Sequence, residues 1–134
     1  MTSDELKTRT KRFALSVIRL GEVLPKSKVS DIIYGQLVRA ATSIGANYRA
    51  ACRARSHADF ISKIGIVEEE SDETQYWLEL LADSDILKRE KLSPLIMEAD
   101  ELTRIFTSSG KTAKSNRPLQ KSALRSSQSQ IRSI

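Results

Sequence analysis

The sequence is poor in the residues on which several structural classes depend. Its 134 residues include one cysteine, three prolines, five glycines and seven aromatic residues (three Phe, three Tyr and one Trp). The single Cys52 excludes an intramolecular disulfide and any multi-cysteine zinc site. The scarcity of proline and glycine favours long helices over turn-rich β architecture. Because 40% of the residues are apolar but few are aromatic, we expect one domain with a mostly aliphatic core.

Long apolar runs are also missing. No stretch approaches the roughly 18 residues that a membrane span needs. Residues 1–20 carry charges throughout, unlike the apolar core of a signal peptide. A lone thiol without a disulfide framework suits a reducing compartment. We therefore expect a cytoplasmic protein that has no membrane partner.

The sequence lacks the residue patterns of catalysis and metal binding. His57 is the only histidine, which excludes a bundle di-iron site with its two Glu-x-x-His pairs and disfavours zinc. It contains no glycine-rich phosphate loop and no nucleophile elbow. We expect no enzyme activity, no cofactor and no small-molecule substrate. His57 is expected to be an exposed first-turn residue, and Cys52 a semi-buried, inert thiol despite the arginines around it.

What the sequence does have is charge separated into blocks. Residues 1–63 hold 12 Lys/Arg and 5 Asp/Glu, residues 64–110 hold 4 and 12, and residues 111–134 hold 6 and none. The net charge of +5 therefore hides a nearly neutral but polarised folded part and a basic C-terminal segment. A subunit with a positive half and a negative half is suited to head-to-tail contacts, which close into rings.

Apolar spacing predicts four helices. We expect them over about residues 4–24, 30–54, 57–82 and 94–110. Their predicted N-caps are Ser3, Ser30, Ser56 and Ser93, with Pro94 in the first helical position and Gly110 as the C-terminal stop. Long helices joined by short connections make an all-α, antiparallel, up-down-up-down four-helix bundle. The bundle domain is expected to cover residues 1–110.

The segment 111–134 has a different composition. Six of its 24 residues are serine, and it contains no acid. Such a segment buries too little apolar surface to offset its ordering entropy, so a disordered basic tail is expected. Leu119, Leu124 and Ile131 would still allow a basic amphipathic helix against a partner.

The stretch 36–81 resembles a bacterial family of four-helix bundles. The family includes the proteins encoded in 23S rRNA intervening sequences and the accessory variability protein of diversity-generating retroelements. The matching residues are Gln36-Leu37-x-Arg39-Ala40-Ala41-x-Ser43-Ile44-Gly45-Ala46-Asn47-Tyr48-Arg49, Arg53-x-x-Ser56, Asp59-Phe60-Ile61-x-Lys63, Ile66-Val67-Glu68-Glu69-Glu70, Asp72-Glu73-Thr74 and Tyr76-Trp77-Leu78. Many members carry Asn-Ile-Ala-Glu-Gly where this chain has Asn47-Tyr48-Arg49-Ala50-Ala51.

The resemblance implies a bundle that assembles into a homopentameric ring and has no known catalytic activity. For the retroelement member it implies binding to a reverse transcriptase and to nucleic acid. Two hypotheses follow for this chain. The first is a non-enzymatic homo-oligomeric scaffold, a pentamer, that binds nucleic acid, RNA in particular, through basic residues. The alternative is a protein-binding accessory module, for example a reverse-transcriptase partner, that does not bind nucleic acid itself.

The candidate residues for nucleic-acid binding are basic residues near the predicted connection between the second and third helices and in the tail. They are Arg49, Arg53, Arg55, Lys63, Lys111, Lys114 and Arg117, with Lys7, Lys11 and Arg12 in the first helix. A merely solvated basic face remains the competing interpretation. The aromatic residues nearby fall on core stripes, so base stacking is not expected and binding should be independent of sequence.

The acidic run 68–73 is the remaining charged feature. It lies inside a helical pattern and lacks the glycine and alternating ligands of a calcium loop, so it is either a solvated face or an ion-pairing surface. In the second case, Glu69 with Glu73, or Glu68 with Asp72, would meet arginines of the second helix, within one subunit or across a ring interface. The candidate structural or interface residues are Arg39, Asn47, Glu68, Glu69, Asp72 and Glu73.

Overall fold

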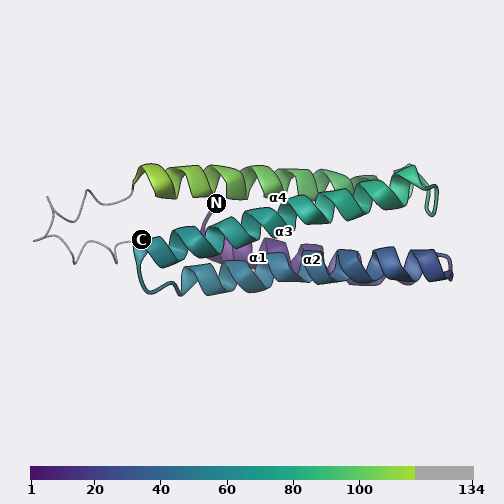
Figure 1. The fold of residues 1–134 in the computed structure, drawn as a ribbon, viewed down its shortest axis with the longest axis horizontal. Coiled ribbons are helices and arrows are strands. Elements are labelled where there is room, and N and C mark those ends of the chain that lie inside the picture. Colours follow the sequence, from purple (N-terminus) through teal and green to yellow (C-terminus); the bar gives the residue numbers. More distant parts are fainter. Residues whose placement is uncertain (117–134) are drawn as a thin grey trace, which may run out of the picture.

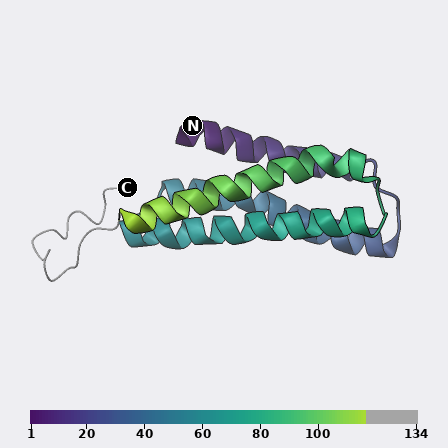
Figure 2. The same ribbon diagram turned by 90° about the horizontal axis from the view of Figure 1, so that it is seen from above.

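The computed structural model describes residues 1–116, which form four helices (Figure 1). These are α1 (Ser3–Leu20), α2 (Lys28–Cys52), α3 (His57–Asp83) and α4 (Arg89–Ser115). Successive helices run in opposite directions along one long axis, as Figures 1 and 2 show from two sides. The predicted antiparallel four-helix bundle is confirmed. Within residues 1–116, no helix combines the length and apolarity needed to cross a bilayer.

The core is aliphatic along the whole bundle. The fully buried side chains include Leu37, Ile44, Ile64, Leu78 and Leu102, which come from three different helices. Its main aromatic contact is a tilted pair of Tyr48 and Phe106, whose ring centroids lie 5.3 Å apart. Contacts are dense between α2 and α3 and between α3 and α4, whereas α1 packs mainly on α2 and touches α4 least. The helix α1 is therefore the least embedded of the four.

The first helix is shorter than predicted. Its N-cap is Thr2, not Ser3, and Thr2 forms a capping box with Glu5. The helix ends at Leu20, where the predicted end was Leu24. The hydroxyl of Tyr34 in α2 shares its one proton between the carbonyls of Val17 and Ile18, at 2.9 and 2.8 Å. These bonds satisfy carbonyls near the helix end, so the chain leaves the helix early.

The second and third helices begin at serine caps. The N-cap of α2 lies three residues earlier than predicted, because the side chain of Ser27 rather than Ser30 accepts the capping bond, from the amide of Ser30 at 3.1 Å. The predicted Ser56 cap of α3 is confirmed, since its hydroxyl accepts a bond from the amide of Asp59 at 3.0 Å. The prediction of a serine N-cap is therefore confirmed for both helices, but its position is correct only for α3.

The fourth helix begins well before the predicted Ser93-Pro94 start. It starts at Arg89 after Lys88, which makes no side-chain capping bond, and Pro94 lies inside the helix. Starting earlier buries Leu92 completely. Burial of a leucine stabilises by about 1.5–3 kcal/mol, which is comparable to the roughly 3 kcal/mol that a proline inside a helix costs through its lost hydrogen bond and its ring clash.

The fourth helix also continues through Gly110, the predicted stop, to Ser115. Both Gly110 and Ala113 are buried. The missing side chain of Gly110 leaves room for the carboxylate of Glu68 on α3. The predicted tail from residue 111 is therefore helical in its first five residues. The rest of that prediction, residues 117–134, lies outside the described residues.

We predict that Gly110→Ala stabilises the protein. Glycine inside a helix costs about 1 kcal/mol relative to alanine. The added methyl would meet only the flexible end of Glu68 and, at 3.5 Å, a methyl of Ile64. Urea unfolding should show a free energy of unfolding that is higher by up to about 1 kcal/mol. The same change in a Glu68→Ala background should show the full gain. A loss in both backgrounds would contradict a continuous α4.

Candidate nucleic-acid interface

The antiparallel arrangement gathers cations at one end of the bundle. The start of α1, the α2–α3 connection and the end of α4 lie together at the left of Figure 1. We call this the basic end. Its residues 3–11, 45–66 and 107–116 hold nine Lys/Arg and three Asp/Glu. At the opposite end, residues 19–34 and 75–95 hold six of each. Segments far apart in sequence thus build one positive region.

A groove between α1 and α2 opens at the basic end, with a volume of about 450 Å³. We call it the α1–α2 groove; its lining includes Lys7, Lys11, Arg49 and Arg53. The helices come close because α2 has Gly45 where they meet. A side chain at that position would lie 3.1 Å from the hydroxyl of Thr10 on α1. Close packing of α1 on α2 at Gly45 therefore places four cations around one depression.

The cations of the α1–α2 groove are largely uncompensated. No acidic side chain of residues 1–116 forms an ion pair with Lys11, Arg49 or Arg53. The one pair at the groove joins Lys7 to Asp4 at 3.9 Å, on the surface, where such pairs contribute little. Both arginines are exposed. Like charges held close by the fold create a positive potential that attracts anions.

Unlike Arg49 and Arg53, the later residues predicted to bind nucleic acid are either paired with an acid or lie outside the α1–α2 groove, as far as the structure describes them. The ammonium of Lys63 lies 2.7 Å from Asp59, so its charge is compensated. This contact, with the backbone amide of Arg55, holds the pKa of Asp59 below its usual range. The side chains of Arg55, Lys111 and Lys114 are exposed at the basic end, outside the groove lining. Arg117 lies outside the described residues.

The ion-pairing residues lie near the middle of the bundle, within one subunit. The guanidinium of Arg39 contacts Glu73 at 2.5 Å and Glu70 at 3.4 Å. Glu70 is not among the residues that the sequence predicted to form this contact. The hydrogen bond from Arg39 lowers the pKa of Glu73, and a weaker one from Trp77 adds to it. These ion pairs connect α2 to α3 on the surface of the bundle.

The other candidate interface residues take no part in the Arg39–Glu73 ion pair. Glu69 and Asp72 are exposed, and no ion pair is formed by either within residues 1–116. Glu68 lies beside Gly110 on α4. The side-chain amide of Asn47 donates to the carbonyl of Ser43, one turn earlier in α2, so Asn47 bonds within its own helix.

Two expectations about single residues are wrong. His57 is buried, with 6% of its surface exposed, because α4 runs past Gly110 and covers the first turn of α3. Its Nε2 lies 2.7 Å from the carbonyl of Ala113, so Nε2 donates, while Nδ1 has no hydrogen-bond partner among the described residues. Cys52 is exposed rather than semi-buried, since the buried stripe of α2 passes through Tyr48 and Ala51 instead.

The described residues do not assemble a metal centre. Among residues 1–116, no three His, Cys, Asp or Glu side chains converge closely enough to hold an ion. The α1–α2 groove offers electrostatic interactions. Its guanidinium and ammonium groups bind phosphate and carboxylate oxygens.

Comparison with other proteins gives a consistent family assignment. Residues 4–108 match the family described as 23S rRNA-intervening sequence protein. A crystal structure of a protein of unknown function from Bacteroides thetaiotaomicron VPI-5482, of the S23 ribosomal protein family, is similar with 34% sequence identity and a TM-score of 0.75. The match covers 83% of this chain and 99% of that one. No functionally curated protein matches the chain.

We predict that the Arg39–Glu73 pair stabilises the fold in a pH-dependent way. Because the folded-state pKa of Glu73 is lowered, its stabilisation is present above the unfolded-state pKa and is lost as pH falls through the folded-state value. Arg39→Met should therefore lower the free energy of unfolding at neutral pH, by less than about 1 kcal/mol for so exposed a pair. The difference from wild type should shrink in acid.

The measurement is urea unfolding at a series of pH values, followed by Trp77 fluorescence. Glu73→Gln in the Arg39→Met background is the control, and it should add little further pH dependence. A stability difference that stays constant into acid would exclude Glu73 as the partner that carries the effect.

Proposed function

The chain belongs to the 23S rRNA-intervening sequence protein family, and from this premise we propose that it is a non-enzymatic, homo-oligomeric scaffold that binds nucleic acid, RNA in particular. The α1–α2 groove is the proposed binding surface. The observation that carries the proposal is that Lys11, Arg49 and Arg53 converge there without an acidic partner in residues 1–116. The exposed Cys52 suits a cytoplasmic location, where thiols stay reduced.

The proposed contacts are to the phosphate backbone. Lysine and arginine side chains that bind phosphates set affinity and position but do not read sequence. Stacking of bases would need exposed aromatic rings, whereas Tyr48 and Phe13 near the groove are buried, with 7% and 3% of their surface exposed. The expected binding is therefore independent of sequence and strongly dependent on salt.

One departure from the family pattern supports this surface. Where many members carry glutamate in the segment Asn-Ile-Ala-Glu-Gly, this chain has Ala50. Ala50, Arg49 and Arg53 line the same shallow extension of the surface. A glutamate at this position would lie next to both arginines and would compensate their charge. Its absence leaves them free to bind an anion.

Oligomerisation is the second element of the proposal. The resemblance implies a homopentamer, and the folded part of this chain has a basic end and an acidic middle. Such a polarised subunit fits head-to-tail contacts that close into a ring. In a ring of five, five grooves would act on one RNA strand, so the modest affinity of each would be multiplied by effective concentration.

The alternative function, a protein-binding accessory module, also has a structural feature in its favour. At the end opposite the basic end, Val23, Val29 and Ile32 are 56%, 58% and 58% exposed. Apolar side chains that cluster on a surface often mark a protein contact. The two functions differ in whether the purified protein binds RNA when no other protein is present.

We predict that Arg49→Gln with Arg53→Gln weakens RNA binding. The probe is a fluorescein-labelled single-stranded RNA of mixed sequence, titrated with nuclease-treated protein and followed by anisotropy. Losing two phosphate contacts should lower the slope of log affinity against log salt by about 1.4. Ala50→Glu should weaken binding as well, and Ala50→Gln should not.

The matched control is Arg19→Gln with Lys28→Gln, which removes the same charge from two exposed residues at the opposite end. It should keep most of the affinity. Equal losses in the two double variants would show that only net charge matters and would remove the groove from the proposal. No binding by the wild-type protein would favour the protein-binding alternative.

We predict that the oligomer depends on charge. Light scattering after size exclusion should give five times the chain mass of 15.0 kDa at low salt. Because screening weakens contacts between opposite charges, a smaller mass is expected in molar sodium chloride. A mass that does not change with salt would mean that charge polarity does not hold the ring together.

A further inference from the structure

The outward side of α1 combines cations with exposed apolar side chains. Two apolar residues lie one turn apart there, Leu15 and Ile18, with 40% and 49% of their surface exposed. Lys11, Arg12 and Arg19 are exposed as well, and each lies three or four residues from Leu15, so all five side chains share one side of the helix. We call these five residues the α1 face. Clustered apolar side chains on a surface often mark a protein contact.

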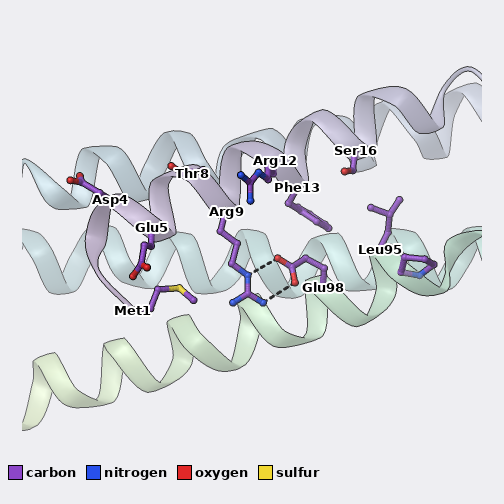
Figure 3. A pocket seen from close by; sticks show the side chains of 11 residues that line it. Met1, Asp4, Glu5, Thr8, Arg9, Arg12, Phe13, Ser16, Leu95 and Glu98 are labelled. Carbon is purple, nitrogen blue, oxygen red and sulfur yellow. Dashed lines mark hydrogen bonds and ion pairs between the residues drawn. The ribbon is translucent and has the colours of Figure 1, made fainter.

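The arginines of α1 differ in how their charge is compensated. The guanidinium of Arg9 contacts both carboxylate oxygens of Glu98, at 2.7 and 2.8 Å, across a groove of about 740 Å³ between α1 and α4 (Figure 3). The same groove is lined by the carboxylates of Asp4 and Glu5. Arg12 lies on the next turn of α1 (Figure 3). Neither Arg12 nor Arg19 forms an ion pair within residues 1–116.

The outward side of α3 has the opposite charge. Four exposed residues follow one another there at spacings of three, four and three, namely Glu69, Asp72, Tyr76 and Glu79. We call them the α3 face. Its three carboxylates form no ion pair within the described chain. Tyr76 exposes 53% of its surface, and its ring lies edge-on to Trp77 with the centroids 5.1 Å apart. Tyrosines are common at the energetic centre of protein interfaces.

The two faces lie on different sides of one subunit. Within residues 1–116, α1 packs against α2 and α4 but not against α3, so α1 and α3 occupy opposite corners of the bundle. Tyr34 of α2 contacts Ile18 of α1. Arg39, little more than one turn further along α2, contacts Glu73 of α3. The faces therefore lie at similar heights along the bundle, and two copies that stand side by side can bring them together.

We propose that the α1 face of one subunit packs against the α3 face of the next. This inference rests on the proposed homo-oligomer and identifies the contact that builds it. The helices α1 and α3 run in the same direction within a subunit, so subunits that point the same way present them in parallel. In the register that places Leu15 against Tyr76, two cations meet two carboxylates. These pairs are Arg12 with Asp72 and Arg19 with Glu79.

The apolar centre and the charges have different roles in this contact. Removing the side chains of Leu15, Ile18 and Tyr76 from water favours association. The charges around them steer the subunits and fix the register more than they add affinity. A single exposed pair contributes little, so Arg19→Gln alone should leave the oligomer intact. Like charges disfavour contacts between two α1 faces or two α3 faces, and a contact between different faces can repeat around a ring.

The first test is light scattering of variants at the apolar centre, without RNA. Leu15→Asp and Tyr76→Asp should each reduce the mass from that of the oligomer to the chain mass of 15.0 kDa, because each places a charge in the contact. Circular dichroism should show unchanged helix content, since both side chains are exposed. The matched control is Ile32→Asp on α2, where the side chain is 58% exposed. This variant should keep the oligomer.

The second test identifies which faces meet, by cross-linking in a Cys52→Ser background with a short bismaleimide. A chain with both Leu15→Cys and Tyr76→Cys should give a ladder of covalent species on a denaturing gel, which ends at the size of the ring. Chains with only one of these cysteines should not be cross-linked, because identical faces do not meet. The two single-cysteine chains, unfolded and refolded together, should give covalent dimers and nothing larger.

The outcomes separate this contact from the proposed function. A monomeric wild-type protein would overturn the proposed homo-oligomer, and the contact with it. A wild-type oligomer that persists in both Leu15→Asp and Tyr76→Asp, or that dissociates equally in Ile32→Asp, would overturn the contact alone. Absence of the ladder in an oligomeric protein, or cross-linking of Leu15→Cys to its own kind, would do the same.

Discussion

Burial of four aliphatic helix faces against one another is the constraint from which the rest of the molecule follows. The buried faces meet only when neighbouring helices run in opposite directions, because the connections are short. Once the directions are fixed, the start of α1, the end of α2, the start of α3 and the end of α4 must lie at one end. The hydrophobic core thus determines where charges meet, although it contains no Lys, Arg, Asp or Glu of residues 1–116.

Electrostatics then divides the surface into compensated and uncompensated regions. Arg39 of α2 and Arg9 of α1 each contact two carboxylates, and these contacts connect α2 to α3 and α1 to α4. At the basic end, Arg49 and Arg53 have no such partner in the described chain. A surface pair contributes little to stability, but an unpaired cluster of cations has a field that reaches a partner in solution. The proposed function uses this second property.

The position of α1 links the two grooves. It lies close to α2 where Gly45 meets Thr10, and it leaves space toward α4, where Arg9 forms the ion pairs. One helix therefore borders a basic groove on one side and an acid-rimmed groove on the other.

The sequence by itself determined the helical class, the number and order of the helices, the aliphatic stripes and the charge blocks, because these depend on local spacing and composition. It also singled out Arg49 and Arg53 as candidates for nucleic-acid binding. The tertiary structure decided what depends on contacts between distant segments. Burial of Leu92 set the start of α4, and packing of Gly110 and Ala113 on α3 set its continuation and buried His57. The grouping of Lys7 and Lys11 with the two arginines likewise required α1 to lie beside α2. Helix ends and shared grooves are decided by small free-energy differences between local hydrogen bonds and long-range burial. Long-range burial depends on residues far apart in the chain, so the neighbouring sequence does not reveal it.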